Sequence, residues 1–312
     1  MDLGSIFTAP TIIKQQQPTF RAPLRFPAIF VQKSKIMVTW NKKSNKLKVC
    51  CSQVKVVDNN NISDDEEACE LVNGTELTIG DECTRAYFFT AVKNNNAIGI
   101  LLLSDIFGFE DSSTQDFAYR LACNGYNVLV PDLFKGDPWT KNRPKALLEE
   151  WITKHKPESK TKTIFESAKW MINEFASLGI SKKLGIIGFC YGGGRVIETL
   201  AQDQGALFGS GVSFYGTRIE SFVVANNNIN VPLLMITGDD DAICSVDSLV
   251  DIKKSCKNNE LMRIEVFEGR GHGFAHRPQT ADEDEDAEKA FMMMRNWLHH
   301  GLIEEKVELK SL

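Results

Sequence analysis

Apolar and polar residues follow two different patterns along most of the chain. Short, almost wholly apolar runs such as those at 99–104 and 184–187 have the length and composition of buried strands. Between them lie longer segments in which apolar residues recur three and four positions apart, the period of an amphipathic helix. The pattern predicts strands at 85–90, 99–104, 127–130, 184–187, 211–215, 233–237 and 263–267, and helices at 113–124, 143–153, 163–178, 195–202, 245–256 and 281–299.

The alternation of these elements predicts an α/β fold. Strands separated by a helix need a crossover connection, and crossovers produce a mostly parallel sheet with helices on both faces. Ligands of such sheets bind at the carboxyl ends of the strands. We therefore look for chemistry in the segments that directly follow a strand.

Charge separates the first part of the chain from the rest. Residues 1–62 hold ten Lys or Arg, only two acidic residues, four of the ten prolines and no sustained apolar period, whereas the whole chain has a net charge of −5. A basic, acid-poor and hydroxyl-rich N-terminus is typical of an organelle transit peptide. We predict a plastid transit peptide at 1–50, a linker at 51–68, one domain at 69–304 and a tail at 305–312, with the mature protein in the chloroplast stroma. An untargeted disordered tail on a cytoplasmic protein is the alternative.

Several classes of protein do not match the composition. The chain has 312 residues, 43% of them hydrophobic and 25% charged, which is typical of a folded globular protein. No apolar run approaches the roughly 18 residues of a membrane span, and the acidic balance disfavours nucleic acid as a partner. The eight cysteines lack the spacing of a metal site and the density of a disulfide scaffold. We expect no metal, no cofactor, no membrane partner and reduced thiols.

The sequence G-F-C-Y-G-G-G at 188–194 directly follows a predicted strand and leads into a helix. This is the nucleophile-elbow pattern with Cys190 in place of serine, in which small residues two before and two after the nucleophile permit a sharp turn. A helix N-terminus favours negative charge on the sulfur. A phosphate-binding loop, or a merely buried Cys190, is the alternative for this motif alone.

Two further strands end in residues that complete a triad. Asp241 belongs to G-D-D-D at 238–241, and His272 lies in a glycine-flanked loop after the last strand. The order nucleophile, acid, histidine is that of α/β-hydrolases. We predict that His272 is the base and that Asp241 orients it, with Asp239 and Asp240 as alternative acids. With His272 as a neutral base, kcat/KM is expected to rise through a pKa of about 6 to 7.

Other histidines are weaker candidates for the base. His155 lies in a polar, basic stretch, and His299 and His300 lie on a predicted C-terminal helix. All three are expected to be solvated.

A tetrahedral intermediate also needs hydrogen-bond donors for its negative oxygen. In this architecture one donor is the backbone amide of the residue after the nucleophile, here Tyr191. The second comes from the loop after the strand at 99–104, which predicts the amide of Ile106.

Five ordered motifs give the chain a resemblance to a known family. They are S-D-I-F-G-F at 104–109, G-Y-N-V-L-V-P-D-L-F at 125–134, G-F-C-Y-G-G-G at 188–194, G-D-D-D at 238–241 and G-H-G-F-A-H-R at 271–277. With them the chain resembles the dienelactone hydrolase family, carboxymethylenebutenolidase-like α/β-hydrolases, and with its N-terminus it looks like a plant, plastid-type member. The resemblance covers about residues 70–300. It implies an α/β-hydrolase fold and a Cys-His-Asp triad that opens lactones and esters through a thioester, without a metal or organic cofactor.

The chain departs from that family at two positions near the site. The family's bacterial enzymes have a glutamate that hydrogen-bonds the resting thiol, where this chain has Asp105. They also hold the substrate carboxylate with two arginines, one of them four residues after the catalytic histidine, where this chain has His276 followed by Arg277. By this resemblance Asp105, His276 and Arg277 are predicted to prime the thiol or bind substrate, and Arg143 is a candidate for the other arginine.

The resulting hypothesis is a cysteine-dependent hydrolase of a small ester or lactone. Alternatives are a non-catalytic ligand-binding protein of the same fold, an acyl-transfer or lactone-rearranging enzyme with the same triad, and a redox-sensing Cys190. The predicted partner is a small-molecule substrate. The sequence is compatible with a monomer and with a dimer.

Overall fold

A computed structural model describes residues 72–178, 180, 182–220, 224 and 228–303. Within these residues, eight strands form one sheet in the order β1-β2-β4-β3-β5-β6-β7-β8. β1 and β2 pair antiparallel with each other, β2 pairs antiparallel with β4, and the remaining neighbours are parallel. The strands are β1 (Val72–Ile79), β2 (Thr84–Ala91), β3 (Gly99–Leu103), β4 (Asn127–Pro131), β5 (Leu184–Phe189), β6 (Phe208–Phe214), β7 (Leu233–Gly238) and β8 (Met262–Phe267).

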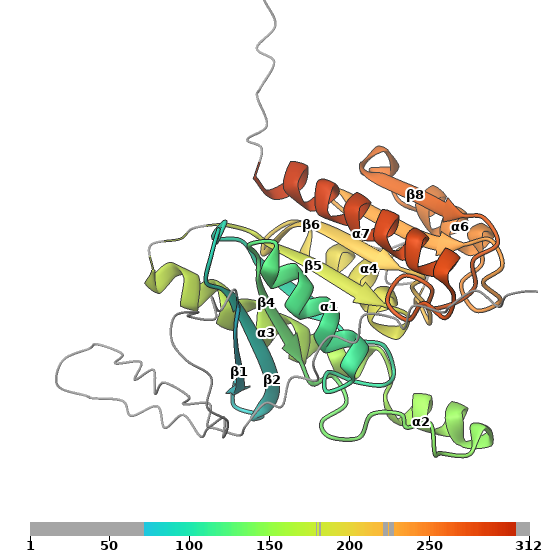
Figure 1. The fold of residues 1–312 in the computed structure, drawn as a ribbon, viewed down its shortest axis with the longest axis horizontal. Helices are drawn as coiled ribbons and strands as arrows, with labels where there is room; N and C mark the ends of the chain where they lie inside the picture. The colour runs from blue at the N-terminus through green and yellow to red at the C-terminus, as the bar shows by residue number, and fades with distance from the viewer. Residues whose placement is uncertain (1–71, 179, 181, 221–223, 225–227, 304–312) are drawn as a thin grey trace, which may run out of the picture. The chain divides into compact units, whose positions relative to one another are not determined.

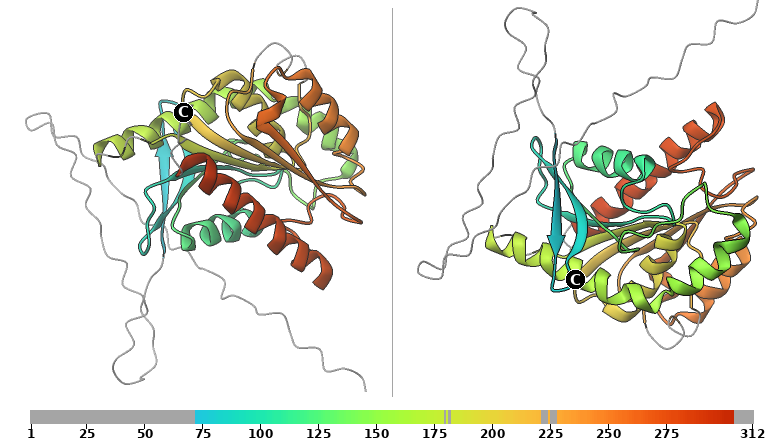
Figure 2. Two further views of the ribbon diagram at one scale, coloured as in Figure 1. Left: turned by 90° about the horizontal axis from the view of Figure 1, so that it is seen from above. Right: turned by 90° about the horizontal axis from the view of Figure 1, so that it is seen from below.

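Helices cover both faces of the sheet. α1 and α7 lie on one face, and α3, α4 and α6 lie on the other (Figure 2). The helices are α1 (Ser112–Cys123), α2 (Leu148–Lys154), α3 (Glu158–Ser177), α4 (Tyr191–Asp203), α6 (Val246–Ser255) and α7 (Ala281–Leu302), with short 3₁₀ turns η1 (Lys145–Leu147) and η2 (Asn259–Leu261). This arrangement confirms the predicted α/β class with a mostly parallel sheet (Figure 1).

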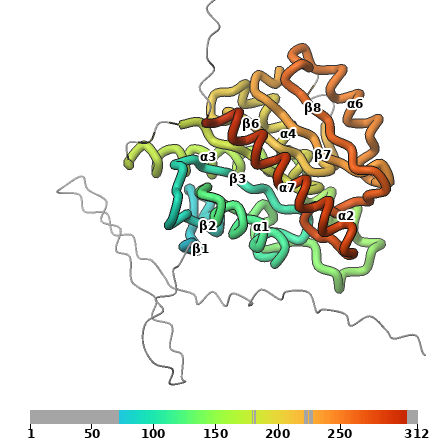
Figure 3. The backbone as a smooth tube through the Cα atoms, turned by 45° about the horizontal axis from the view of Figure 1, so that its top comes forward, coloured from blue at the N-terminus to red at the C-terminus, as the bar shows by residue number. Residues whose placement is uncertain are grey.

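The core lies around the central parallel strands. Every residue of β3, β4, β5 and β7 is buried, as expected for strands that helices cover on both faces. β1 and β2 lie at one end of the sheet and β8 at the other (Figure 3). Because β3, β5, β6, β7 and β8 run parallel, their carboxyl ends lie at the same edge of the sheet. The candidate residues directly follow these ends.

The strand pattern of the sequence missed one element and misplaced others. β1 was not predicted, because only its two end residues are buried and no apolar run marks it. The helix predicted at 143–153 is a 3₁₀ turn followed by the shorter α2. α4 begins at Tyr191 rather than at residue 195. The predicted segments at 1–50, 51–68 and 305–312 lie outside the described residues, so those boundaries stay predictions.

Among the helices in the described ranges, none is both long enough and apolar enough to serve as a transmembrane segment.

Candidate active site

Cys190 occupies a strained turn between β5 and α4. It is the N-cap of α4, with φ 52° and ψ −115°, a backbone conformation that residues with a β carbon rarely adopt. The turn is tight enough that a Cβ on Gly192 would lie 2.5 Å from the Ser104 carbonyl oxygen at the end of β3. The geometry is that of the predicted nucleophile elbow, and it places the sulfur at the N-terminal end of a 13-residue helix.

His272 and Asp241 meet from loops after β8 and β7. His272 Nδ1 lies 2.7 Å from Asp241 Oδ2. The other carboxylate oxygen, Oδ1, accepts hydrogen bonds from the backbone N–H groups of Ile243 at 2.8 Å and Cys244 at 2.9 Å. The Asp241 side chain is fully buried. Burial alone would raise its pKa, but the hydrogen bonds from His272 and these amides hold the pKa of Asp241 below its ordinary value.

The neighbouring aspartates have other positions. Asp239 and Asp240 are exposed, and Asp239 Oδ1 accepts a hydrogen bond from the Gly269 N–H at 2.6 Å. Of the three candidate acids, Asp241 is therefore the one that contacts the imidazole.

The ionisation of His272 depends on Cys190 as well as on Asp241. Nε2 is buried and has no hydrogen bond that meets normal geometric limits among the described residues, yet Cys190 lies close enough to affect its ionisation. Burial alone would lower the pKa of His272. Its hydrogen bond to Asp241 and its interaction with the Cys190 sulfur outweigh burial and raise the pKa to about 10. The prediction of a neutral base with a pKa of about 6 to 7 is wrong in this respect, because the Asp241 carboxylate and the Cys190 sulfur both favour the imidazolium form of His272.

The two candidate oxyanion donors belong to the nucleophile turn and to the neighbouring loop after β3. Tyr191 is the first residue of α4, and Ile106 lies in the loop after β3. A backbone hydrogen bond from Trp139 stabilises that loop, since the Trp139 N–H donates to the Ile106 carbonyl at 2.8 Å. The close approach of β3 to Gly192 brings this loop next to the nucleophile turn. Both amides remain predictions as oxyanion donors.

Asp105, His276 and Arg277 bind one another. Asp105 Oδ2 accepts hydrogen bonds from His276 Nε2 at 3.0 Å and from Arg277 Nε at 2.9 Å, and Arg277 also pairs with Asp111 at 2.6 Å. Burial lowers the pKa of His276, although Asp105 opposes the shift. Neutral His276 therefore accepts a hydrogen bond at Nδ1 from the Tyr215 hydroxyl, at 2.6 Å.

This network changes the expectations for those three residues. The hydrogen bonds of the Asp105 side chain go to partners other than Cys190, and two carboxylates balance the charge of Arg277 within the protein. Arg143, the other candidate, forms an ion pair with Asp137. Their roles in priming or substrate binding stay predictions.

His155 is buried, which contradicts the expectation that it is solvated. It lies among aromatic rings, with Nε2 3.1 Å from Asp137 Oδ2 and Nδ1 3.1 Å from Lys160 Nζ. His299 and His300 are exposed on α7, as expected. The described residues hold no cluster of three or more His, Cys, Asp or Glu side chains able to bind a metal.

The profile of the Dienelactone hydrolase family matches residues 84–302. The chain belongs to the dienelactone hydrolase family. Its α/β-hydrolase fold agrees with this assignment, and membership supports a hydrolase that acts on esters or lactones.

Other members and solved structures show how far the similarity reaches. The chain is 30% identical over 206 residues to a carboxymethylenebutenolidase homolog from Xenopus tropicalis, covering 64% of this chain and 80% of that one. It is 28% identical over 183 residues to the homolog from Homo sapiens, covering 57% and 71%. The crystal structure of a putative dienelactone hydrolase from Klebsiella pneumoniae has a TM-score of 0.62 at 22% identity, covering 72% of this chain and 98% of that chain.

The sequence patterns did not identify two residues that lie near the candidate triad. Tyr215 and Thr217 follow β6, whose carboxyl end lies between β5 and β7. The Tyr215 ring lies 5.1 Å from the His272 ring between centroids, and Thr217 Oγ1 lies 3.7 Å from Cys190 Sγ. Both residues directly follow a parallel strand, and this position in the sequence could have identified them as candidates.

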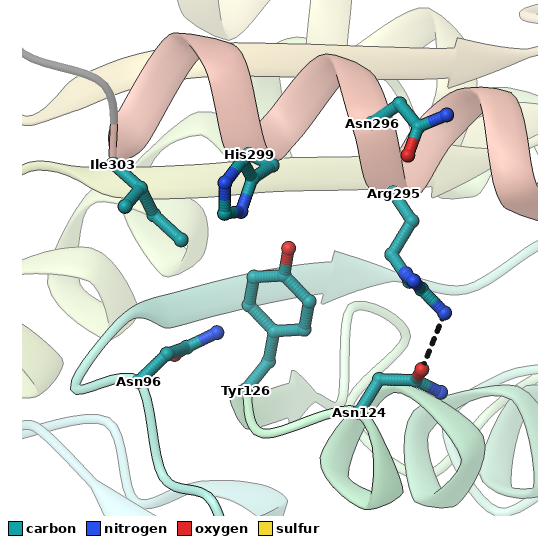
Figure 4. Close-up of a pocket in the computed structure, with 7 residues that line it drawn as sticks. All are labelled: Asn96, Asn124, Tyr126, Arg295, Asn296, His299 and Ile303. Carbon is teal, nitrogen blue, oxygen red and sulfur yellow. Dashed lines mark hydrogen bonds between the residues drawn. The ribbon is translucent and has the colours of Figure 1, made fainter.

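A separate pocket lies away from the triad. It is lined by Asn96, Asn124, Tyr126, Arg295, Asn296, His299 and Ile303 (Figure 4). Arg295 donates to the Asn124 side-chain oxygen at 2.7 Å across it. Asn96 and Tyr126 precede β3 and β4, so this pocket lies at the amino ends of the strands, the opposite edge from Cys190.

Proposed function

We propose that this chain is a cysteine-dependent hydrolase of small esters or lactones in which Cys190 is the nucleophile, His272 transfers protons and Asp241 orients His272. The observation that carries the proposal is the partly buried imidazole of His272, hydrogen-bonded to Asp241 at 2.7 Å through Nδ1 and close enough to Cys190 for the sulfur to raise its pKa. A base held between an acid and a nucleophile is the arrangement that acyl transfer needs.

In the first half of the proposed reaction, the Cys190 thiolate attacks the carbonyl carbon of the ester or lactone. The carbonyl oxygen becomes an oxyanion, and the Tyr191 and Ile106 amides donate hydrogen bonds to it. When the tetrahedral intermediate collapses, the C–O bond to the leaving alkoxide breaks and the imidazolium of His272 gives its Nε2 proton to that oxygen. The products are an alcohol, or the opened hydroxyl end of a lactone, and a thioester on Cys190.

In the second half, neutral His272 takes a proton from water as the water oxygen attacks the thioester. Collapse of the second tetrahedral intermediate breaks the C–S bond and releases a carboxylic acid. The thiolate and the imidazolium are regenerated. If a substrate hydroxyl attacks instead of water, the same steps give acyl transfer or rearrangement. Labelled water separates these outcomes, because hydrolysis places one labelled oxygen in the acid product.

The triad is tested by replacing the nucleophile. We expect Cys190→Ala to lower kcat/KM for p-nitrophenyl acetate by about 10³-fold or more, because no thioester can form. His272→Ala should cause a loss of similar size. Hydrolysis is followed by release of nitrophenolate, and folding is checked by circular dichroism.

Cys123→Ala is the matched control, since Cys123 is a partly exposed thiol at the end of α1. It should leave turnover unchanged. Full activity in a folded Cys190→Ala variant would refute the proposal, and tight lactone binding without turnover by the wild type would favour a non-catalytic binding protein.

A further inference from the structure

The glycine run after Cys190 is longer than the turn requires. A nucleophile elbow needs small residues two positions before and after the nucleophile, which Gly188 and Gly192 supply. Gly194 lies further into α4, and a Cβ there would collide with the carbonyl oxygen of Thr217. Gly194 thus lets the segment after β6 lie directly against the first turn of α4.

That contact fixes Thr217 beside the nucleophile. Its backbone N–H donates to the Cys190 carbonyl at 3.0 Å, and the Cys190 N–H donates to the Phe214 carbonyl at 3.0 Å. Arg195 on α4 donates to the carbonyl of Arg218, the next residue. The segment is therefore fastened to the nucleophile turn and to α4 on both sides of Thr217.

The Thr217 side chain faces the reacting sulfur. Thr217 is only 6% exposed, and its Oγ1 lies 3.7 Å from Cys190 Sγ, which is within hydrogen-bond reach for the large sulfur atom. A thiolate has no proton to give, so the hydroxyl must be the donor when the sulfur is charged. A hydrogen bond to a charged acceptor is stronger than one between neutral groups.

We propose that Thr217 is a catalytic hydrogen-bond donor to the Cys190 sulfur, stabilising the thiolate before attack. This inference rests on the proposed role of Cys190 as the nucleophile. When the C–S bond forms, the sulfur loses its charge and the hydroxyl loses a charged acceptor. Thr217 therefore raises the fraction of enzyme that carries a reactive thiolate.

The test is the pH dependence of Cys190 alkylation by iodoacetamide in the whole chain. Thr217→Val removes the hydroxyl and keeps the shape of the side chain. We expect the midpoint of the alkylation profile to rise by about one pH unit, so that alkylation slows about tenfold at pH values well below the wild-type midpoint, the effect of losing one hydrogen bond to a charged group. Thr217→Ser should return the midpoint to within about 0.3 unit of wild type. Modification of Cys190 is counted by peptide mass spectrometry.

Two further measurements separate this role from a structural one. The rate at the high-pH plateau should stay at or slightly above the wild-type value in Thr217→Val, because a thiolate held less tightly is no less nucleophilic. Thr114→Val is the matched control, since Thr114 is a fully buried threonine on α1. It should leave the midpoint unchanged. Should Thr217→Val not fold, Thr217→Ala removes the same hydroxyl from a smaller side chain.

An unchanged midpoint in Thr217→Val overturns the inference, as does an equal shift in the valine and serine variants, which would assign the effect to packing. The proposed function fails on a different result. If Cys190→Ala still hydrolyses esters, Cys190 is not the nucleophile, whatever the alkylation midpoint shows. If Cys190→Ala is inactive and the Thr217→Val midpoint does not move, only the role of Thr217 is refuted.

Discussion

The ionisation of His272 determines the pH range over which the proposed reaction can run. Because Asp241 and the Cys190 sulfur raise its pKa to about 10, the imidazolium is the main form at neutral pH. Protonated His272 can supply the leaving-group proton directly. The same interactions stabilise the folded protein below pH 6.5, the ordinary value, and this contribution is lost as the pH rises through about 10.

We predict that kcat/KM for an ester of an unactivated alcohol, whose leaving oxygen needs a proton, falls on the alkaline side only near pH 10, where His272 loses its proton. Asp241→Asn should move this fall toward neutral pH, because the amide removes the carboxylate that stabilises the imidazolium. The measurement is the pH profile of kcat/KM for the wild type and the variant.

Asp239→Asn provides the matched control, because Asp239 is exposed and contacts the Gly269 amide instead of His272. It should leave the profile in place. A wild-type profile that already falls near pH 7 would contradict the raised pKa.

At the level of elements, α4 both begins directly after the proposed nucleophile and anchors the segment after β6. Arg195 and Glu198 on α4 are buried and bonded at 2.9 and 2.8 Å. Each side chain also bonds to the backbone of the segment after β6. Arg195 donates to the Arg218 carbonyl, and Glu198 accepts a hydrogen bond from the Glu220 N–H. Breaking this pair leaves a buried charge without its partner.

We predict that Glu198→Leu lowers the free energy of unfolding by about 3 to 5 kcal/mol, because buried Arg195 loses its counter-charge. The double variant Arg195→Met, Glu198→Leu should recover much of this loss. Chemical denaturation measures both. Glu285→Leu removes one member of an exposed ion pair with Lys289 and should change stability by no more than about 1 kcal/mol. A loss of that small size in Glu198→Leu would contradict the prediction.

The elements differ in how well their sequences predict them. β3 and β5 are buried along their full length, so their apolar runs reveal them. β1 is half exposed and is defined by its pairing with β2, which no local pattern records. The start of α4 was predicted too late because glycines at 192–194 are poor helix formers, and tertiary contacts override that preference here.

At the scale of the whole molecule, topology made the meeting of the three candidate triad residues predictable and left the contacts around them unpredictable. Parallel strands bring their carboxyl ends to one edge, so residues after β5, β7 and β8 had to lie near one another. Which partner each polar side chain takes depends on distances between loops. Asp105 and His276 are 171 residues apart in sequence and 3.0 Å apart in space, and no spacing rule in the sequence specifies that contact.

The prediction about cellular location depends on the difference in charge between the N-terminal segment and the rest of the chain. That segment lies outside the described residues. We propose that the predicted transit peptide at 1–50, which lies in the basic segment 1–62 with its ten Lys or Arg and two acidic residues, directs the protein into plastids. A fusion of residues 1–62 to a fluorescent protein should accumulate in the plastids of plant cells, whereas a fusion of residues 63–312 should remain in the cytosol. Diffuse cytosolic fluorescence from the first fusion would contradict the proposal.

The backbone angles of Cys190 have a consequence for the evolution of this protein. At φ 52° and ψ −115°, glycine would sit without steric conflict, whereas any residue with a β carbon costs about 1 to 3 kcal/mol. Selection for heat resistance alone would therefore favour glycine at this position. If the proposed reaction were no longer needed, glycine would replace this cysteine readily, since that one replacement would make the protein harder to unfold.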